Sequence, residues 1–150
     1  MAQGRFPHQT LFRQWSPGDR EAVENAMRLT DLEDFADRPV HSLSGGQRQR
    51  CWLAMVLAQD TSLLLLDEPT TFLDLKVQVD LMALLSRIVR EEGRTMILVL
   101  HELNLAAAFA DRVVMMREGE IFAEGTGAEV ICPEELRAVF DLRSDVIADP

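Results

Sequence analysis

The sequence of 150 residues predicts an α/β fold in which helices flank a parallel sheet. Ser62–Leu66 is short, apolar and bounded by polar residues, so we expect a strand covered on both faces. Thr95–Leu100 is a second apolar strand, and a long amphipathic helix, Asp74–Glu92, separates the two. The alternation of strands and helices from Leu63 to Ala110 is typical of a parallel α/β sheet.

The first third of the chain is predicted to be mainly helical. Met1–Trp15 has no sustained hydrophobic period, and we expect it to be irregular. Ser16 is suited to a helix N-cap and Pro17 to the first helical position, which predicts a helix over Asp19–Leu29. A second short helical piece is expected over Leu32–Val40.

The elements that follow have clear start and stop signals. Ser44 begins a helix expected over Gln47–Gln59, with a polar first turn and an apolar remainder. Gly93 is a stop signal for the long helix. Beyond the second strand we expect a helix over residues 102–110 and then a hairpin of strands 112–116 and 121–124 that turns at Glu118–Gly119. Two small helices are expected after it, over residues 125–131 and 133–140. Residues 141–150 show no clear organisation.

The composition is that of a globular protein with an acidic surface. Hydrophobic residues make up 47%, and the formal net charge of -10 argues against a nucleic-acid partner, which needs clustered Lys and Arg. No apolar run approaches the roughly 20 residues of a membrane-spanning helix, and we expect no export signal at the N-terminus. Cys51 and Cys132 have no metal-type spacing, which favours a reducing cytosolic compartment.

Two carboxylates and a histidine directly follow the predicted strands. Asp67 and Glu68 come after the first strand and His101 after the second. Because ligands bind at the carboxyl ends of parallel strands, we expect the three side chains to converge. Asp67 is suited to hold Mg²⁺ on nucleotide phosphates, Glu68 to deprotonate an attacking water, and His101 to contact the γ-phosphate. The alternative, a solvated turn, fits an isolated Asp-Glu pair better than one preceded by four leucines.

Ser44, Gly45, Gly46 and Gln47 form a second candidate site. A helix N-terminus offers free amides and the positive end of a dipole, so it suits an anion, and Ser44 and Gln47 add side-chain donors. The alternative is an ordinary capped helix with a glycine turn. Asp74 is placed to cap the long helix. His8 and His41 have no comparable context and receive no role.

At these residues the chain resembles the ATP-binding cassette family, the nucleotide-binding subunits of ABC transporters. Leu43–Gln47 matches the signature motif of that family, and Leu63–Glu68 matches Walker B with its catalytic glutamate. Thr71–Asp74 resembles the D-loop, and His101 resembles the switch histidine. Residues 4–8, 67–74 and 101–106 are similar to the importers of ferric siderophores, haem and cobalamin, and ferric-siderophore import of the enterobactin type is the first choice.

The resemblance implies a partial ABC-type P-loop NTPase fold. Residues 1–60 would form a helical subdomain ending in the signature helix, and residues 61–150 the C-terminal part of the ATPase core. Two such domains would sandwich two ATP molecules head to tail. The segment Ser44–Gln47 would then contact the γ-phosphate bound on the opposite subunit, and Asp74 would couple the two sites. Asp67 would serve Mg²⁺, Glu68 would be the general base, and His101 would hold the γ-phosphate.

The resemblance also implies cofactors, partners and a location. The cofactors are ATP and Mg²⁺. The partners are a second ABC subunit, transmembrane permease subunits and, indirectly, a periplasmic or lipoprotein substrate-binding protein. The protein would be cytoplasmic and peripheral on the inner face of the cell membrane, where ATP hydrolysis energises uptake of a ferric siderophore.

One departure from the family pattern is large. No Gly-x-x-x-x-Gly-Lys-[Ser/Thr] motif, the P-loop, occurs in the 150 residues. We therefore expect the C-terminal portion of a cassette, with very weak ATP binding on its own. The alternative is a non-catalytic module that pairs with an intact cassette and offers its signature motif in trans. A non-transport ABC ATPase of the DNA-repair or chromosome-condensation type is disfavoured, because the sequence has no sustained heptads and no basic patch.

Overall fold

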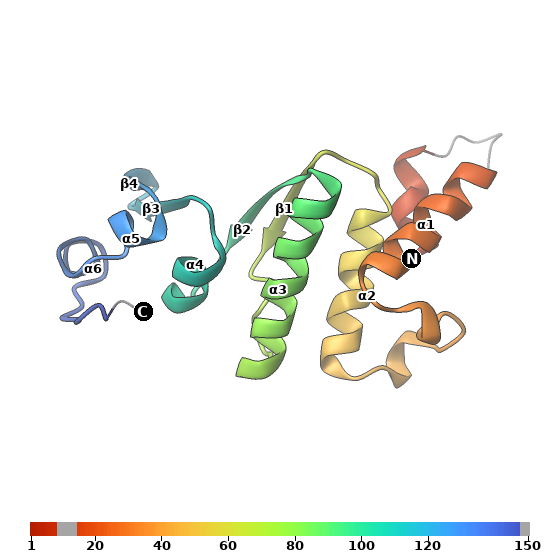
Figure 1. Cartoon of the computed structure of the whole chain (residues 1–150), viewed down its shortest axis with the longest axis horizontal. Helices are drawn as coiled ribbons and strands as arrows, with labels where there is room; N and C mark the ends of the chain where they lie inside the picture. The colour runs from red at the N-terminus through yellow and green to blue at the C-terminus, as the bar shows by residue number, and fades with distance from the viewer. Residues whose placement is uncertain (9–14, 148–150) are drawn as a thin grey trace. The chain divides into compact units, whose positions relative to one another are not determined.

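A computed structural model describes residues 1–8 and 15–147 of the chain (Figure 1). The chain separates into two compact units, Met1–Val99 and Leu100–Pro150. The elements of the first unit are η1 (Ala2–His8), α1 (Pro17–Leu29), η2 (Glu33–Phe35), η3 (Val40–Ser42), α2 (Gly45–Leu57), β1 (Leu63–Asp67), α3 (Leu75–Glu92) and β2 (Thr95–Val99). Those of the second are α4 (Leu103–Phe109), β3 (Val113–Arg117), β4 (Glu120–Gly125), α5 (Gly127–Val130) and α6 (Pro133–Phe140).

The two strands of the first unit form a parallel pair, as predicted. β1 and β2 run in register from Leu63 opposite Thr95 to Asp67 opposite Val99, with α3 as the crossover between them. The α/β class and the strand–helix–strand order are therefore confirmed. This arrangement places Asp67 and Glu68 at the carboxyl end of β1.

One face of this parallel pair is open, and the prediction of a strand covered on both faces is wrong. Leu64 is 2% exposed, whereas Leu65, which points to the other face, is 69% exposed. Leu63, Ile97 and Val99 are about half exposed on the same two strands. An apolar run shows that a strand can be buried, but burial also requires something to pack on each face.

The N-terminal segment is more regular than predicted. Residues 2–8 form the 3-10 helix η1, not an irregular stretch, while residues 9–14 lie outside the described residues. Gly4 is buried, and a Cβ at this position would collide with the carbonyl oxygen of Met55 in α2. His8 Nε2 lies 2.6 Å from the carbonyl oxygen of Gln59, so η1 is tied to the end of α2.

The helix predicted over Leu32–Val40 is replaced by two single turns, η2 and η3. Asp31, just after α1, has a φ of 55°, a left-handed conformation that breaks the helical path. Pro39, just before η3, has an extended ψ of 138°. The remaining helices of the first unit begin and end close to their predicted positions.

The core of the first unit is built from buried side chains of α1, α2 and α3 together with Leu64 of β1. The buried apolar side chains of these helices are Ala26, Leu29, Cys51, Leu53, Ala54, Leu57, Leu81, Met82, Leu84, Leu85 and Ile88. Gly93 ends α3 with a φ of 63°, which is the left-handed stop that the sequence predicts. The start of α3 is capped by Asp74, whose carboxylate accepts from the Val77 amide at 3.0 Å.

The second unit has its own small core. β3 and β4 form an antiparallel hairpin with an irregularity between Met115 and Met116, which confirms the predicted hairpin. Met115, Val130, Ile131 and Leu136 are buried together beneath it. The two small helices are also confirmed as α5 and α6.

The C-terminal end of the described chain is irregular, and none of the described helices is suited to cross a membrane. Residues 141–147 have no regular secondary structure, as predicted, and residues 148–150 lie outside the described residues. In the described part of the chain, no helix has both the length and the apolar character needed to cross a membrane. The predicted division at residue 60 differs from the division into compact units at residue 99 and stays a prediction.

Candidate functional site

The start of α2 carries the first candidate site. Ser44 is the N-cap, and its hydroxyl accepts a hydrogen bond from the Gln47 amide at 3.3 Å. In return, Gln47 Oε1 accepts from the Ser44 amide at 3.0 Å, which completes a capping box. Both side chains are thus held by the helix start itself, and the first turn contains no acidic residue. The positive end of the helix dipole is therefore left without a compensating charge.

The two glycines at this helix start have different surroundings. A Cβ on Gly45 would meet nothing within 4 Å, so this position is open to a ligand or a partner. A Cβ on Gly46 would lie 2.9 Å from Val77 Cγ1, so the backbone of α2 approaches α3 closely at this point. The two helices are seen beside each other in Figure 1. One glycine exposes the site and the other fixes its distance from α3.

The end of β1 carries the second candidate site. Asp67 is exposed as the last residue of the strand. Glu68 has a φ of 48°, and its amide donates to the carbonyl oxygen of Val99 at 3.1 Å. Thr71 Oγ1 donates to Glu68 Oε2 at 3.1 Å. A glutamate held in the left-handed region costs roughly 1–2 kcal/mol, and such strain gathers at functional positions.

Two glutamines connect the helices to the turn that follows these carboxylates. Gln49 of α2 donates from Nε2 to the Pro69 carbonyl oxygen at 2.8 Å. Gln78 of α3 donates from Nε2 to the Thr70 carbonyl oxygen at 3.3 Å, and Thr70 itself is 1% exposed. Sequence reasoning missed Gln49 and Gln78, because their partners are carbonyl groups 20 and 8 residues away. They place the helix start of α2 and the end of β1 in one connected part of the first unit.

Asp74 and the turn before it complete this region. Asp74 caps α3 through Val77, the residue that Gly46 of α2 approaches. Phe72 in the same turn has a φ of 63° and is fully exposed. A large apolar side chain exposed on a strained backbone is unusual for a turn that contacts only water.

His101 belongs to the second unit, directly after its first residue Leu100. It is exposed and has interactions of its own. The convergence of His101 with Asp67 and Glu68 is therefore untested and stays a prediction. Within the first unit, the structure does bring Ser44–Gln47 and Asp74 together through Val77.

The donor set for a metal is small. Among the described residues, no group of three or more His, Cys, Asp and Glu side chains could hold a metal ion. Asp67 is a single exposed carboxylate at a strand end. One carboxylate fits Mg²⁺ held mainly by nucleotide phosphates and water, which is how Mg²⁺ binds in many nucleotide sites.

Several known proteins are similar to this chain in sequence. The ABC transporter family model matches residues 2–71. The chain is 49% identical over 150 residues to the ferric enterobactin transport ATP-binding protein FepC of Escherichia coli (strain K12) and covers 55% of it. It is 50% identical over 148 residues to the probable siderophore transport system ATP-binding protein YusV of Bacillus subtilis (strain 168), covering 54% of that protein. The chain thus spans about half the length of the curated relatives it matches.

Solved structures give the same result. An inward-facing putative metal-chelate type ABC transporter matches with a TM-score of 0.87 at 30% identity, over 95% of this chain and 56% of that one. The cbiO1 protein of Clostridium perfringens, part of an ABC transporter complex, matches with a TM-score of 0.76 at 33% identity, over 90% and 53%.

By these similarities the chain resembles the ATP-binding proteins of ABC transporters, and it has part of the α/β fold of that class. Relatives whose names state import or transport of siderophores or iron chelates resemble the chain over nearly its whole length, at 45–50% identity. The predicted resemblance and fold class are confirmed.

Proposed function

We propose that the chain works as the ATP-hydrolysing subunit of an ABC importer that energises uptake of a ferric siderophore. The observation that carries the proposal is the connection between two half-sites in the first unit. An uncompensated helix start, Ser44–Gln47, lies on the same framework as a strand end that carries Asp67 and Glu68. The siderophore specificity is supported by relatives whose names state transport of ferric enterobactin and of siderophores.

Each residue would have a distinct role. Glu68 would take a proton from the attacking water, and the hydrogen bond from Thr71 would hold its carboxylate in place beforehand. Asp67 would hold Mg²⁺, which supplies charge neutralisation on the β- and γ-phosphates when bound. His101 would contact the γ-phosphate. These roles are supported by the exposure of Asp67 and by the left-handed backbone conformation of Glu68.

The helix start would serve a nucleotide held by a second subunit. The amides of Gly45 and Gly46 and the side chains of Ser44 and Gln47 would contact the γ-phosphate of that ATP. Asp74 would couple the two sites, since Val77 lies between it and Gly46. Phe72 supports contact with another protein surface at the same turn, because it is apolar and fully exposed.

The partners follow from this role. They are a second ABC subunit, the permease in the membrane and, through it, a substrate-binding protein. The protein would be located on the cytoplasmic face of the cell membrane.

The experiment compares the 150-residue chain with a fusion that carries the P-loop segment of a related ABC subunit ahead of Met1. We expect negligible MgATP binding and turnover by the chain, because the sequence contains no P-loop. The fusion should bind MgATP and hydrolyse it, and Glu68→Gln in the fusion should bind but turn over at least about 10²-fold more slowly. A folded fusion that failed to bind MgATP would disprove the proposal.

A second candidate function is favoured by the absence of the P-loop sequence together with the open helix start. The chain would then pair with an intact cassette, offer Ser44–Gln47 to its ATP and modulate transport without hydrolysing ATP itself. A pull-down against a P-loop-bearing cassette, with and without ATP, separates the two functions. ATP-dependent capture with no added turnover would favour the second.

A further inference from the structure

An ion-pair cluster outside the motifs described above links three helices of the first unit. Asp31 follows α1, and its carboxylate lies between Arg50 of α2 and Arg87 of α3. Arg50 Nη1 lies 2.8 Å from Asp31 Oδ2, and Arg87 Nη2 lies 3.1 Å from Asp31 Oδ1. One carboxylate therefore bridges α2 and α3.

The same arginines also hold the backbone at the end of α1. Arg87 Nη2 donates to the Leu29 carbonyl oxygen at 3.1 Å, and Arg50 Nη1 donates to the Thr30 carbonyl oxygen at 3.4 Å. Asp31 has a φ of 55°, which turns the chain away from the helix and brings its side chain between the two arginines. The end of α1 is thus a fixed support for the bridging carboxylate.

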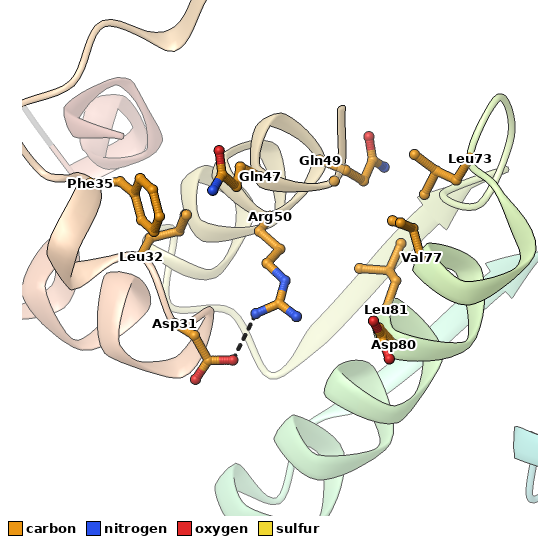
Figure 2. A pocket seen from close by; sticks show the side chains of 11 residues that line it. Asp31, Leu32, Phe35, Gln47, Gln49, Arg50, Leu73, Val77, Asp80 and Leu81 are labelled. Atoms are coloured by element: carbon orange, nitrogen blue, oxygen red, sulfur yellow. Dashed lines mark hydrogen bonds and ion pairs between the residues drawn. The ribbon is translucent and has the colours of Figure 1, made fainter. Parts of the chain in front are cut away.

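The space between α2 and α3 explains why such a bridge is needed. A cavity of about 260 Å³ is lined by Gly46, Gln47 and Arg50 of α2, by Val77 and Leu81 of α3, and by Asp31 among others. Figure 2 shows Arg50 extending from α2 toward Asp31, with Val77, Asp80 and Leu81 on the opposite wall. The cavity opens to solvent, so close packing does not hold the two helices together where it lies.

We propose that Asp31 is a positioning residue: held by Arg50 and Arg87, it sets the spacing of α2 and α3 across this cavity. The two helices approach closely at Gly46 and Val77 and are linked again at Asp31, so the bridge adds a second fixed point between them beside the core that they share. The position of the Ser44–Gln47 helix start relative to Asp74 then depends on Asp31. That consequence for nucleotide contact rests on the proposed function, whereas the spacing itself does not.

The test uses Asp31→Asn in the 150-residue chain. Asn accepts the left-handed conformation, so the substitution removes the charge with little backbone strain. The matched control is Asp60→Asn, because Asp60 also has a positive φ, 56°, and pairs with Arg94 at 2.9 Å, away from the cavity. The readout is the proton NOE between Gly46 Hα and the Val77 methyl groups, together with hydrogen exchange at the Gln47 amide.

We expect Asp31→Asn to lose the Gly46–Val77 NOE and to speed exchange at Gln47, while Asp60→Asn changes neither. A merely stabilising ion pair would lower the urea midpoint and leave the native NOE intact, and that result would overturn the inference. Asp31→Gly and Arg87→Gln test the same link if Asp31→Asn does not fold. If none of the three folds, Asp31 is a general stabilising residue and the positioning role is rejected.

ATP-dependent capture by a P-loop-bearing cassette gives the functional readout. Asp31→Asn should weaken this capture relative to Asp60→Asn. Failure of the unmodified chain to be captured would count against the proposed function, and the NOE would still decide the role of Asp31. Unchanged capture together with an unchanged NOE would overturn the inference.

Discussion

Two helices of the first unit, α1 and α2, start with the same capping structure, but the residues around the two helix starts differ in burial and charge. α1 and α2 both start at a serine whose hydroxyl accepts from the third helical amide, and both have glycine at the second helical position. The third residue of α1 is Asp19, which is 4% exposed and pairs with Arg5 at 2.8 Å. The third residue of α2 is Gln47, at an exposed start without an ion pair in the described structure.

This difference separates a structural helix start from one suited to bind an anion. A carboxylate at the third position satisfies the cap amide and also neutralises the positive end of the helix. Glutamine forms the same hydrogen bond without the charge, so the end still attracts an anion. The capping pattern alone therefore does not identify a functional site. The charge of the third helical residue and the exposure of the helix start distinguish the two helices.

The largest loss of stability should come from the enclosed pair at α1. Arg5 Nε donates to Asp19 Oδ1 and its Nη1 donates to the Ala58 carbonyl oxygen at 3.1 Å, so the pair ties η1, α1 and the end of α2 together. Removing one partner of an enclosed ion pair leaves the other without compensation. Arg5→Met should therefore lower the urea midpoint more than any other substitution described below.

The same pair predicts a dependence on pH. The side-chain hydrogen bond from Ser16, followed by that from Arg5, lowers the pKa of Asp19 from 3.8 to about 2. Because the pKa in the folded state is below that in the unfolded state, the stabilisation is complete above 3.8 and is lost as the pH falls toward 2. Urea midpoints measured across this range should fall more steeply for the unmodified chain than for Asp19→Asn. Equal slopes would contradict this account of the pair.

Removing the cap hydroxyls should have a moderate effect at both helices. Ser16→Ala and Ser44→Ala should each destabilise the chain by about 1 kcal/mol, as cap substitutions generally do. Ser16→Ala should lower the stability more than Ser44→Ala, because the Ser16 hydroxyl also donates to Asp19 Oδ2 at 2.7 Å. Urea unfolding gives both values, with Ser42→Ala as the control outside the two capping boxes. A larger cost at Ser44 would reverse the comparison.

The two glycines at the second helical position should respond in opposite directions. A Cβ at Gly18 meets only Ser16 Oγ at 3.8 Å, so Gly18→Ala should stabilise the chain by about 0.4–1 kcal/mol. A Cβ at Gly46 would lie 2.9 Å from Val77 Cγ1, and valine has little freedom to move. Gly46→Ala should destabilise the chain by about 1 kcal/mol, the cost of overpacking reduced by the helix preference of alanine. Stabilisation by both would show that α2 and α3 separate easily.

Local signals explain what the sequence could predict. Ser16, Ser44 and Asp74 cap their helices because their side chains accept from amides three residues away. Gly93 ends α3 because glycine adopts the left-handed backbone conformation without steric cost. The pairing of β1 with β2 and the hairpin of β3 with β4 follow from apolar pattern and turn residues. The candidate site residues were also chosen from the sequence, because each motif is contiguous, and their roles stay a prediction.

Long-range contacts explain what it could not predict. The exposure of Leu65 depends on which segments pack against the strand, and the hydrophobic pattern of the strand does not predict them. Asp31 pairs with Arg50, which is 19 positions away in the sequence, and with Arg87, which is 56 positions away. No local sequence pattern predicts contacts over such separations. The 3-10 turn at Ala2–His8 is fixed by Gly4 against Met55, again a contact between distant segments. Sequence reasoning therefore identified the ends of elements better than the contacts that hold them together.

Gln47→Glu should change the stability of the chain the least among these substitutions and should still clearly weaken its ATP-dependent capture. Gln47→Glu gives α2 the charge that α1 has at Asp19 while keeping the capping box. A carboxylate in the first helical turn should stabilise the chain by about 0.3–1 kcal/mol. It should also weaken ATP-dependent capture by a P-loop-bearing cassette, because the helix end would no longer attract a phosphate. Gln59→Glu adds the same charge beyond the other end of α2 and should leave capture unchanged. Equal capture by the two variants would mean that the helix start is a structural cap like that of α1. Weaker capture by a more stable Gln47→Glu chain would show that neutral glutamine at this position serves anion binding at a small cost in stability.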